Sequence, residues 1–174
     1  MKSLPLFVLL LLLTWNAPAQ TLPRPRLHTL LQEAPVVVVF LSTTCPICQK
    51  YAGMLPALQQ KYPSIQWVGV FTKWEEVVDI QQFKQAYQLN FPLFWDKNNR
   101  LLRQLEATTT PEVLLLDRKG LILYRGAIDN WFYGLGKYRP KTTEHYLEDA
   151  LDAYLQGKEI LIKKTDPIGC VIEQ

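Results

Sequence analysis

The sequence predicts an α/β domain in which a central mixed sheet is covered by helices on both faces. Two observations support this prediction: strand-like and helix-like segments alternate through the first half of the chain, and two apolar runs joined by a tight turn precede a final helix. The chain has 174 residues, 48% of them hydrophobic and 20% charged, which suits one domain with a substantial core. Its net charge of +3 comes without a dense basic face, so nucleic acid is not expected as a partner.

The order of elements follows from hydrophobic periodicity and turn residues. Runs of β-branched, aliphatic and aromatic residues bounded by turns predict strands at 36–41, 64–71, 91–95, 112–117 and 121–126. Apolar residues at three- and four-residue spacing predict helices at 27–34, 49–62, 72–88, 100–106 and 143–156. The domain would therefore span 35–157, after a lead-in over 20–34 and before an extended tail over 158–174.

Two helix starts carry residues of the type that caps helices. Thr72 and Glu75 have the spacing of a capping box, which would begin the second of the long helices. Thr142 or Thr143 would cap the last helix. In the second long helix, Val78 is expected to face inward with the other apolar residues.

Residues 1–19 have the pattern of a signal peptide. Lys2 provides a positive start, an apolar run extends from Leu4 to Trp15, and Ala17-Pro18-Ala19 supplies the small residues that a signal peptidase reads. The run is shorter than the roughly 20 residues that a membrane-spanning helix needs. We therefore expect cleavage after Ala19 and an extracytoplasmic protein, periplasmic or secreted. An uncleaved segment that associates with the membrane is the alternative.

The motif that carries chemistry is Cys45-Pro46-Ile47-Cys48, which opens a helix directly after the strand at 36–41. Free backbone N–H groups and the helix dipole favour an anion there, so the pKa of Cys45 is expected to fall. Pro46 suits the first helical turn because its missing N–H has no partner to lose. Cys48 lies one turn along, within reach of a mixed disulfide on Cys45. The pattern predicts thiol–disulfide exchange with both cysteines as catalytic residues.

A zinc site is the competing interpretation of two closely spaced cysteines. It would need a second ligand pair, and the remaining candidates Cys170, His28 and His145 show no paired spacing. We therefore expect no bound metal. No organic cofactor is expected either, because electrons in such a reaction travel on sulfur.

Cys170 is a third cysteine, and an odd thiol in an exported protein needs an explanation. It can be a small hydrophobic residue in a tail packed on the domain. It can also resolve a disulfide on Cys45 or Cys48, or pair with another molecule. The sequence leaves these interpretations open.

The order of elements resembles the thioredoxin fold. Three features carry the resemblance: the cysteine pair after the first core strand, Thr110-Pro111 before the hairpin, and the closing helix. It implies a cis peptide bond at Pro111 and a groove in which the backbone of Thr110 pairs with an extended substrate. An ordinary trans proline at a strand start is the alternative. The long interval between Cys48 and Pro111 implies a helical insertion.

The later segments resemble a peroxiredoxin-like branch of the AhpC/TSA redoxins, through the strand end at 124–129 and the Gly169-Cys170 tail. This resemblance implies an oxidoreductase that exchanges disulfides with protein thiols and relies on a redox partner to reset its cysteines. Two residues depart from the thioredoxin pattern. Val39 stands where thioredoxin carries a buried aspartate, and Thr44 stands where it carries a tryptophan. Proton transfer to Cys48 would then come from water or another side chain.

Two other functions stay open. A thiol peroxidase would use Cys45, with Ser42 three residues before it and Arg125 as the arginine that holds thiolate and peroxide. The neighbouring Cys48 and the Thr110-Pro111 pair fit dithiol exchange better. A non-catalytic redoxin module would instead dock on a partner through the aromatic loop at 129–140, with Trp131 and Tyr133 as its anchors.

Overall fold

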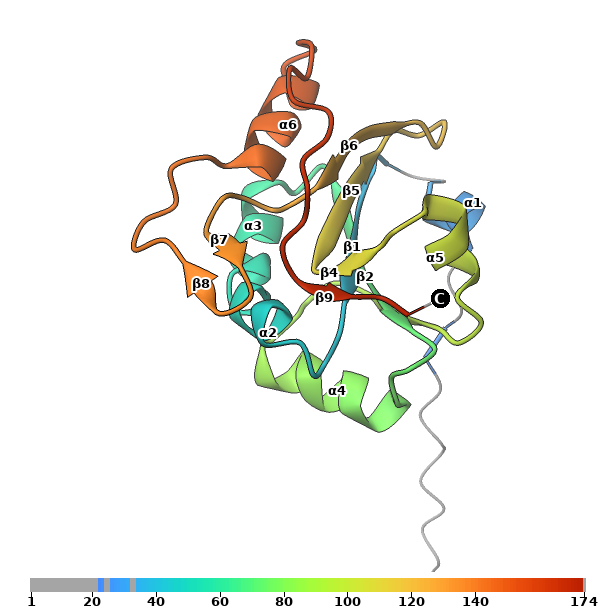
Figure 1. The fold of residues 1–174 in the computed structure, drawn as a ribbon. Coiled ribbons are helices and arrows are strands. Elements are labelled where there is room, and N and C mark those ends of the chain that lie inside the picture. Colours follow the sequence, from blue (N-terminus) through green and yellow to red (C-terminus); the bar gives the residue numbers. More distant parts are fainter. Residues whose placement is uncertain (1–21, 24–25, 32–33, 174) are drawn as a thin grey trace, which may run out of the picture.

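A five-stranded mixed sheet forms the centre of the molecule, in the order β3-β2-β1-β5-β6 (Figure 1). The computed structural model describes residues 22–23, 26–31 and 34–173, so the predicted signal peptide lies outside the described residues. Parallel pairing joins β1 to β2 and β2 to β3, whereas β5 runs antiparallel to both β1 and β6. The strands are β1 Val36–Leu41, β2 Gln66–Thr72, β3 Leu93–Asp96, β5 Glu112–Leu116 and β6 Ile122–Gly126.

Helices cover both faces of this sheet, which confirms the predicted fold class. They are α1 Leu27–Leu30, α2 Pro46–Ala52, α3 Leu55–Lys61, α4 Val77–Ala86, α5 Arg100–Leu105 and α6 Tyr146–Leu155. Four further strands are very short: β4 Thr109–Thr110, β7 Phe132–Gly134, β8 Lys137–Tyr138 and β9 Cys170–Val171. The predicted helical insertion is present, because α4 and α5 lie between the cysteine pair and Pro111.

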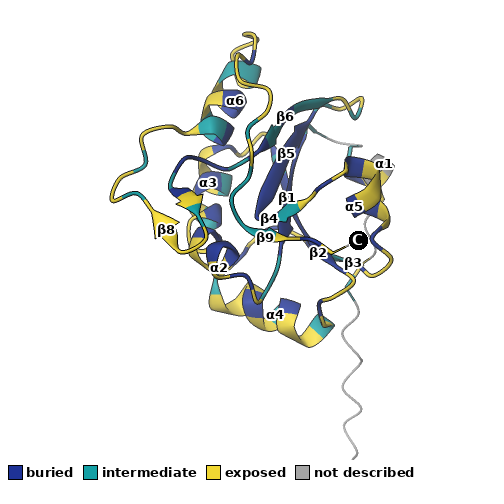
Figure 2. Cartoon of the chain, in the orientation of Figure 1, coloured by how far each residue is buried: buried dark blue, intermediate teal, exposed yellow. Residues whose placement is uncertain are grey.

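The core has two halves, one on each side of β1. Val37 and Val39 pack with the layer that contains α2, α3, α4 and α6. Val38 and Phe40 point the other way and pack with α1 and α5. This alternation follows from the two-residue period of a strand, and it explains why every residue of β1 is buried (Figure 2). Among the described residues, no helix is both long and apolar enough to span a membrane.

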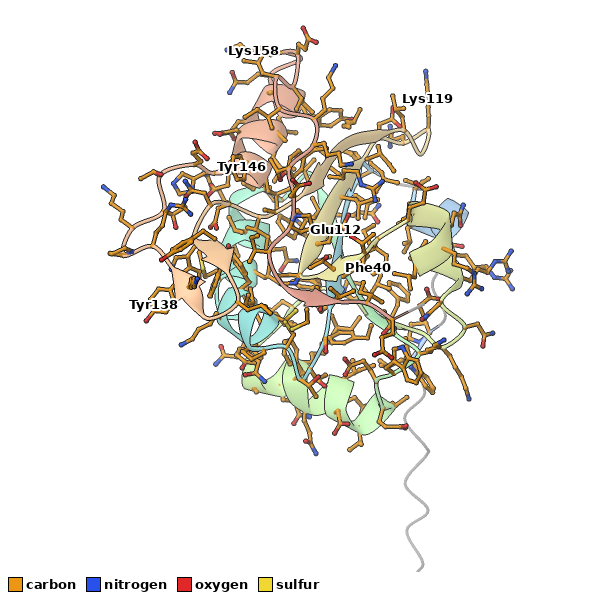
Figure 3. All side chains as sticks on the ribbon, viewed as in Figure 1. Phe40, Glu112, Lys119, Tyr138, Tyr146 and Lys158 are labelled. Carbon is orange, nitrogen blue, oxygen red and sulfur yellow. The ribbon has the colours of Figure 1, made fainter. Side chains whose placement is uncertain are left out.

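The hairpin of β5 and β6 is confirmed by its antiparallel register. Asp117 shapes its turn, because its carboxylate accepts hydrogen bonds from the backbone N–H groups of Lys119 at 2.8 Å and Leu121 at 2.9 Å. Figure 3 shows Lys119 at the outer tip of this hairpin and Glu112, at the other end of β5, in the middle of the molecule.

The single helix predicted at 49–62 is wrong, since the structure has two helices there. The chain leaves α2 at Gly53 and enters α3 at Leu55. Pro56 in the first turn of α3 explains the break, because proline has no N–H to donate back to the carbonyl of Ala52.

Both capping predictions are also wrong. Thr72 ends β2, α4 begins only after Glu76, and Val78 on that helix is 57% exposed. The final helix begins after His145 and has no side-chain cap. Thr143 instead pairs with Asn130, which accepts its backbone N–H at 3.0 Å and donates to its hydroxyl at 2.8 Å. Local spacing gave no sign of these longer-range partners.

The C-terminal tail is held against the domain. Figure 1 shows it descending from α6 past β6 to β9, which lies beside β4. The backbone of Arg125 in β6 donates to Lys163 O at 3.0 Å and accepts from Thr165 N at 3.0 Å. Further along, β9 pairs antiparallel with β4. The tail is extended, as predicted, but it has specific partners along its length.

Candidate redox site

Cys45 lies where β1 ends and α2 begins. Its backbone is extended, with φ −77° and ψ 117°, and it occupies the N-cap position of α2, followed by Pro46 in the first turn. Cys48 lies one turn further on the same helix. Both cysteines are buried, with 1% of Cys45 exposed. The sequence therefore folds locally as its motif predicted, a strand leading into a helix that begins with the cysteine pair.

Three groups surround the sulfur of Cys45. The Cys48 thiol hydrogen-bonds to it. When protonated, Cys45 Sγ donates to the carbonyl oxygen of Thr110 at 3.3 Å. The thiol of Cys170 donates to Cys45 Sγ across 2.7 Å. The peptide bond between Thr110 and Pro111 is cis, as the resemblance to thioredoxin implied. The structure thus gathers all the sequence-predicted site residues together with a third cysteine.

The three thiols have different acidities. The pKa of Cys45 falls to about 5, mainly because the Cys48 thiol donates a hydrogen bond to it. Burial raises this pKa, but the hydrogen bonds from Cys48 and Cys170 together outweigh the effect of burial. Burial raises the pKa of Cys48 well above its usual value, and donation to Cys45 raises it further. Burial and the same kind of donation raise the pKa of Cys170 to about 12. At neutral pH the negative charge therefore resides on Cys45.

The loop before Cys45 is held by Glu75, which was expected from its spacing to be part of a helix cap. The buried carboxylate of Glu75 accepts from Thr43 N at 3.2 Å and from Thr43 Oγ1 at 2.5 Å. Gln49 Nε2 donates to Thr43 O at 2.9 Å, and Ser42 N donates to Cys48 Sγ at 3.4 Å. One signal could have revealed Glu75: it follows β2, and the carboxyl ends of parallel strands meet at one edge of a sheet.

A cavity of about 400 Å³ opens beside Cys170. Polar residues from the β1–α2 loop, the β2–α4 loop and β4 line it, together with the end of the tail. They include Ser42, Thr44, Glu75, Thr110, Cys170 and Val171. The cavity therefore places hydroxyl and carboxylate groups next to Cys170 and Thr110.

The aromatic loop packs beside the site instead of standing free. The Trp131 ring contacts the Tyr51 ring of α2 edge-on, with centroids 5.5 Å apart. The Tyr51 hydroxyl donates to Asp129, which also accepts from Trp131 N at 2.8 Å. Of the two expected anchors, Tyr133 is 54% exposed, whereas Trp131 is partly buried. Trp131 therefore helps to hold the loop against α2.

Arg125, the arginine considered for a peroxidase, binds a different part of the molecule. Its Nη2 donates to Leu105 O at 2.8 Å, to Glu106 O at 3.0 Å and to the buried Glu112 carboxylate at 3.3 Å. Its side chain thereby joins β6 to the end of α5 and to β5. None of these partners is a cysteine.

His145, one of the candidate zinc ligands, lies beside an acidic side chain three residues further along the chain. Half of the His145 side chain is exposed, and it lies 3.7 Å from Glu148. The side chain of His28 lies outside the described residues. In the part of the chain that is described, no group of three or more histidine, cysteine or acidic residues is arranged to hold a metal ion.

The fold and the cysteine pair at the start of α2 define a thioredoxin-like redoxin. A family model described as the AhpC/TSA family matches residues 14–125, more than half of the chain, and the chain belongs to that family. Membership supports an oxidoreductase in the general sense. No curated protein matches the chain.

Solved structures share the fold. A hypothetical protein from Sinorhizobium meliloti is 25% identical, with a TM-score of 0.73 over 84% of this chain and 82% of that one. An uncharacterized conserved protein from Geobacillus kaustophilus is 20% identical, with a TM-score of 0.70 over 83% and 79%. StoA from Bacillus subtilis is 22% identical, with a TM-score of 0.51 over 70% and 82%.

Proposed function

We propose that this protein is an exported thiol–disulfide oxidoreductase that exchanges disulfides with protein substrates through Cys45 and Cys48. One observation carries the proposal. Cys45, with its pKa lowered to about 5, has the Cys48 thiol as a hydrogen-bond donor and the backbone of Thr110 as a neighbour. A thiolate, a second thiol and a backbone edge are the three components that exchange with an extended peptide needs.

The reaction runs in two steps when the protein acts as a reductant. Cys45 Sγ attacks a substrate disulfide, the substrate S–S bond breaks, one substrate thiolate leaves, and a mixed disulfide forms on Cys45. Cys48 then releases its proton and attacks Cys45 Sγ, so that the second substrate thiolate leaves. Two electrons pass to the substrate and a Cys45–Cys48 disulfide remains. A redox partner reduces that disulfide, and the reverse sequence oxidises a substrate dithiol.

Trapping the mixed disulfide tests this proposal. In a Cys48→Ser/Cys170→Ser double variant, both sulfurs near Cys45 are gone, while serine at 48 keeps a hydrogen-bond donor beside the thiolate. We expect this variant to form a stable adduct with insulin or with a peptide disulfide. The adduct should be linked through Cys45 and should be released by a reductant. Mass spectrometry identifies the linkage. A variant that forms no adduct, together with a parent protein that does not reduce insulin, would instead favour the non-catalytic docking module.

Export rests on the signal-peptide pattern of residues 1–19, and a disulfide-cycling protein suits an oxidising compartment. We expect the exported protein to begin at Gln20, which mass spectrometry of the intact protein checks. A chain that retains residues 1–19 and fractionates with membranes would contradict cleavage.

A thiol peroxidase is the second candidate, because a peroxide also requires a cysteine of low pKa. The engagement of Arg125 with Glu112 and the end of α5 counts against it. Peroxide-dependent thiol consumption that persists in Cys48→Ser would favour the peroxidase over dithiol exchange.

A further inference from the structure

The C-terminal segment occupies the backbone edge that a substrate would use. Cys170 pairs with Thr110 and Val171 pairs with Thr109 in an antiparallel register. The pairing continues beyond the two strands, because Ile172 N donates to Thr108 O at 2.9 Å. The edge next to Cys45, which the proposed function assigns to an extended substrate, is therefore filled by the protein's own chain.

We call this segment, residues 163–173, the strap. It is fastened at both ends. At its start, Thr165 N donates to Arg125 O at 3.0 Å, and Thr165 Oγ1 accepts from Ala127 N at 2.9 Å. At its end, Ile172 is only 8% exposed and packs in the core beside α5, while Trp74 Nε1 donates to Glu173 O at 3.1 Å. Hydrogen bonds and apolar burial together hold Cys170 at the redox site.

A glycine allows the strap to come this close. A Cβ atom on Gly169 would lie 1.9 Å from the carbonyl oxygen of Thr110, far inside any tolerated contact. The residue before Cys170 must therefore lack a side chain if the strap is to lie as it does. This close fit at the backbone, together with the sulfur contact of 2.7 Å, distinguishes the strap from a tail that merely rests on the surface.

We propose that the strap imitates a substrate strand and that Cys170 is a third redox cysteine, which exchanges with Cys45. The inference deepens the proposed function and rests on it, since the occupied edge is the one assigned to substrates. In the exchange, Cys170 releases its proton and its sulfur attacks Cys45 Sγ of a Cys45–Cys48 disulfide. The Cys45–Cys48 bond breaks, Cys48 leaves as a thiolate and takes up a proton, and a Cys45–Cys170 disulfide forms. No electrons enter or leave the protein.

The strap also defines the class of substrate. Gly169 implies a glycine before the substrate cysteine, because even a Cβ atom there would collide with Thr110 O. Val171 is 81% exposed, so the position after the cysteine is unrestricted. Ile172 is buried, which implies an aliphatic residue two positions after the cysteine. The expected substrate is an extended segment of the form glycine, cysteine, any residue, aliphatic residue.

The disulfide pattern of single-cysteine variants tests the redox role of Cys170. The purified Cys48→Ser protein is oxidised with one equivalent of diamide, alkylated and digested for mass spectrometry. We expect a monomer with an intramolecular Cys45–Cys170 disulfide, and the matched Cys170→Ser protein should form Cys45–Cys48. If Cys170 in Cys48→Ser is alkylated while Cys45 forms dimers or stays free, the proposal is overturned. Because this assay needs no substrate, its result is separable from insulin turnover.

A glycine substitution tests the imitation of substrate. Gly169→Ala forces the strap away from Thr110, so the site is open to substrate more of the time. We expect kcat/KM for a peptide disulfide with the strap's own sequence pattern to rise roughly tenfold, as for a closed state destabilised by about 1.4 kcal/mol. Gly53→Ala is the control, since a Cβ there meets nothing closer than 3.8 Å. An unchanged or lower kcat/KM in Gly169→Ala would overturn the imitation.

Discussion

Replacement of Cys45 by serine is expected to lower kcat/KM for insulin reduction by at least about 1,000-fold, to the uncatalysed rate. Cys45 alone of the three cysteines has a pKa, about 5, that leaves it ionised at neutral pH. A serine hydroxyl stays protonated there and has no sulfur with which to form the mixed disulfide. Neither remaining thiol can substitute, because the pKa of each is raised by burial.

The other two cysteine variants are the controls for this result. Cys170→Ser retains the Cys45–Cys48 pair and should keep turnover within about tenfold of the parent, allowing for a change in the neighbouring Cys45. Cys48→Ser should retain slower turnover, because Cys170 also contacts Cys45 Sγ. Turnover by dithiothreitol-coupled insulin precipitation, with circular dichroism to check folding, measures all three. If Cys45→Ser kept more than about a tenth of the parental rate, Cys45 would not be the attacking residue.

Much of the site could be predicted because its information is local. The β-branched run of β1 leads directly into the cysteine pair, and Pro46 suits the first turn of α2. The position of Thr110 and Pro111 followed only from the resemblance to a known fold. No periodicity in the sequence brings them near Cys45, which is 65 residues away from Thr110.

The features that escaped prediction depend on contacts between distant residues. Glu75 matches a capping box by spacing, yet its carboxylate binds Thr43, 32 residues earlier in the chain. The low pKa of Cys45 was expected from the helix dipole, but hydrogen bonds from Cys48 and Cys170 are its main causes. The strap pairs with a strand of only two residues, which is too short to produce an alternating pattern. Its one local signal is Gly169 beside Cys170.

The reduced protein is expected to become less stable as the pH falls from 8 to 5. The pKa of Cys45 is lowered from 9.0 to about 5 in the folded protein, so between these values the unfolded chain binds more protons. Stability therefore rises with pH across this interval and is lost as pH falls toward the folded pKa. Each unit of pKa difference corresponds to about 1.4 kcal/mol, and we expect the free energy of unfolding to change by a few kcal/mol. Urea unfolding at pH 5, 6.5 and 8 measures the change.

The oxidised protein and Cys45→Ser are the controls, because neither has a Cys45 thiol to titrate. Their free energies of unfolding should change less across the same interval, and an equal change in all three proteins would contradict the assignment. Above about pH 9 the sign reverses, since the raised pKa values of Cys48 and Cys170 make the unfolded chain release protons first.

The same titration bears on the direction of electron flow. A folded state that stabilises the Cys45 thiolate stabilises the reduced form of the protein, because the thiolate exists only before the disulfide closes. Each 1.4 kcal/mol gained by the reduced form raises the two-electron potential by about 30 mV. The difference in unfolding free energy between reduced and oxidised protein at each pH therefore also gives the shift of its potential from that of the unfolded dithiol at the same pH. A steep difference would indicate a protein that tends to accept electrons from substrate thiols, whereas a flat one would favour a reductant.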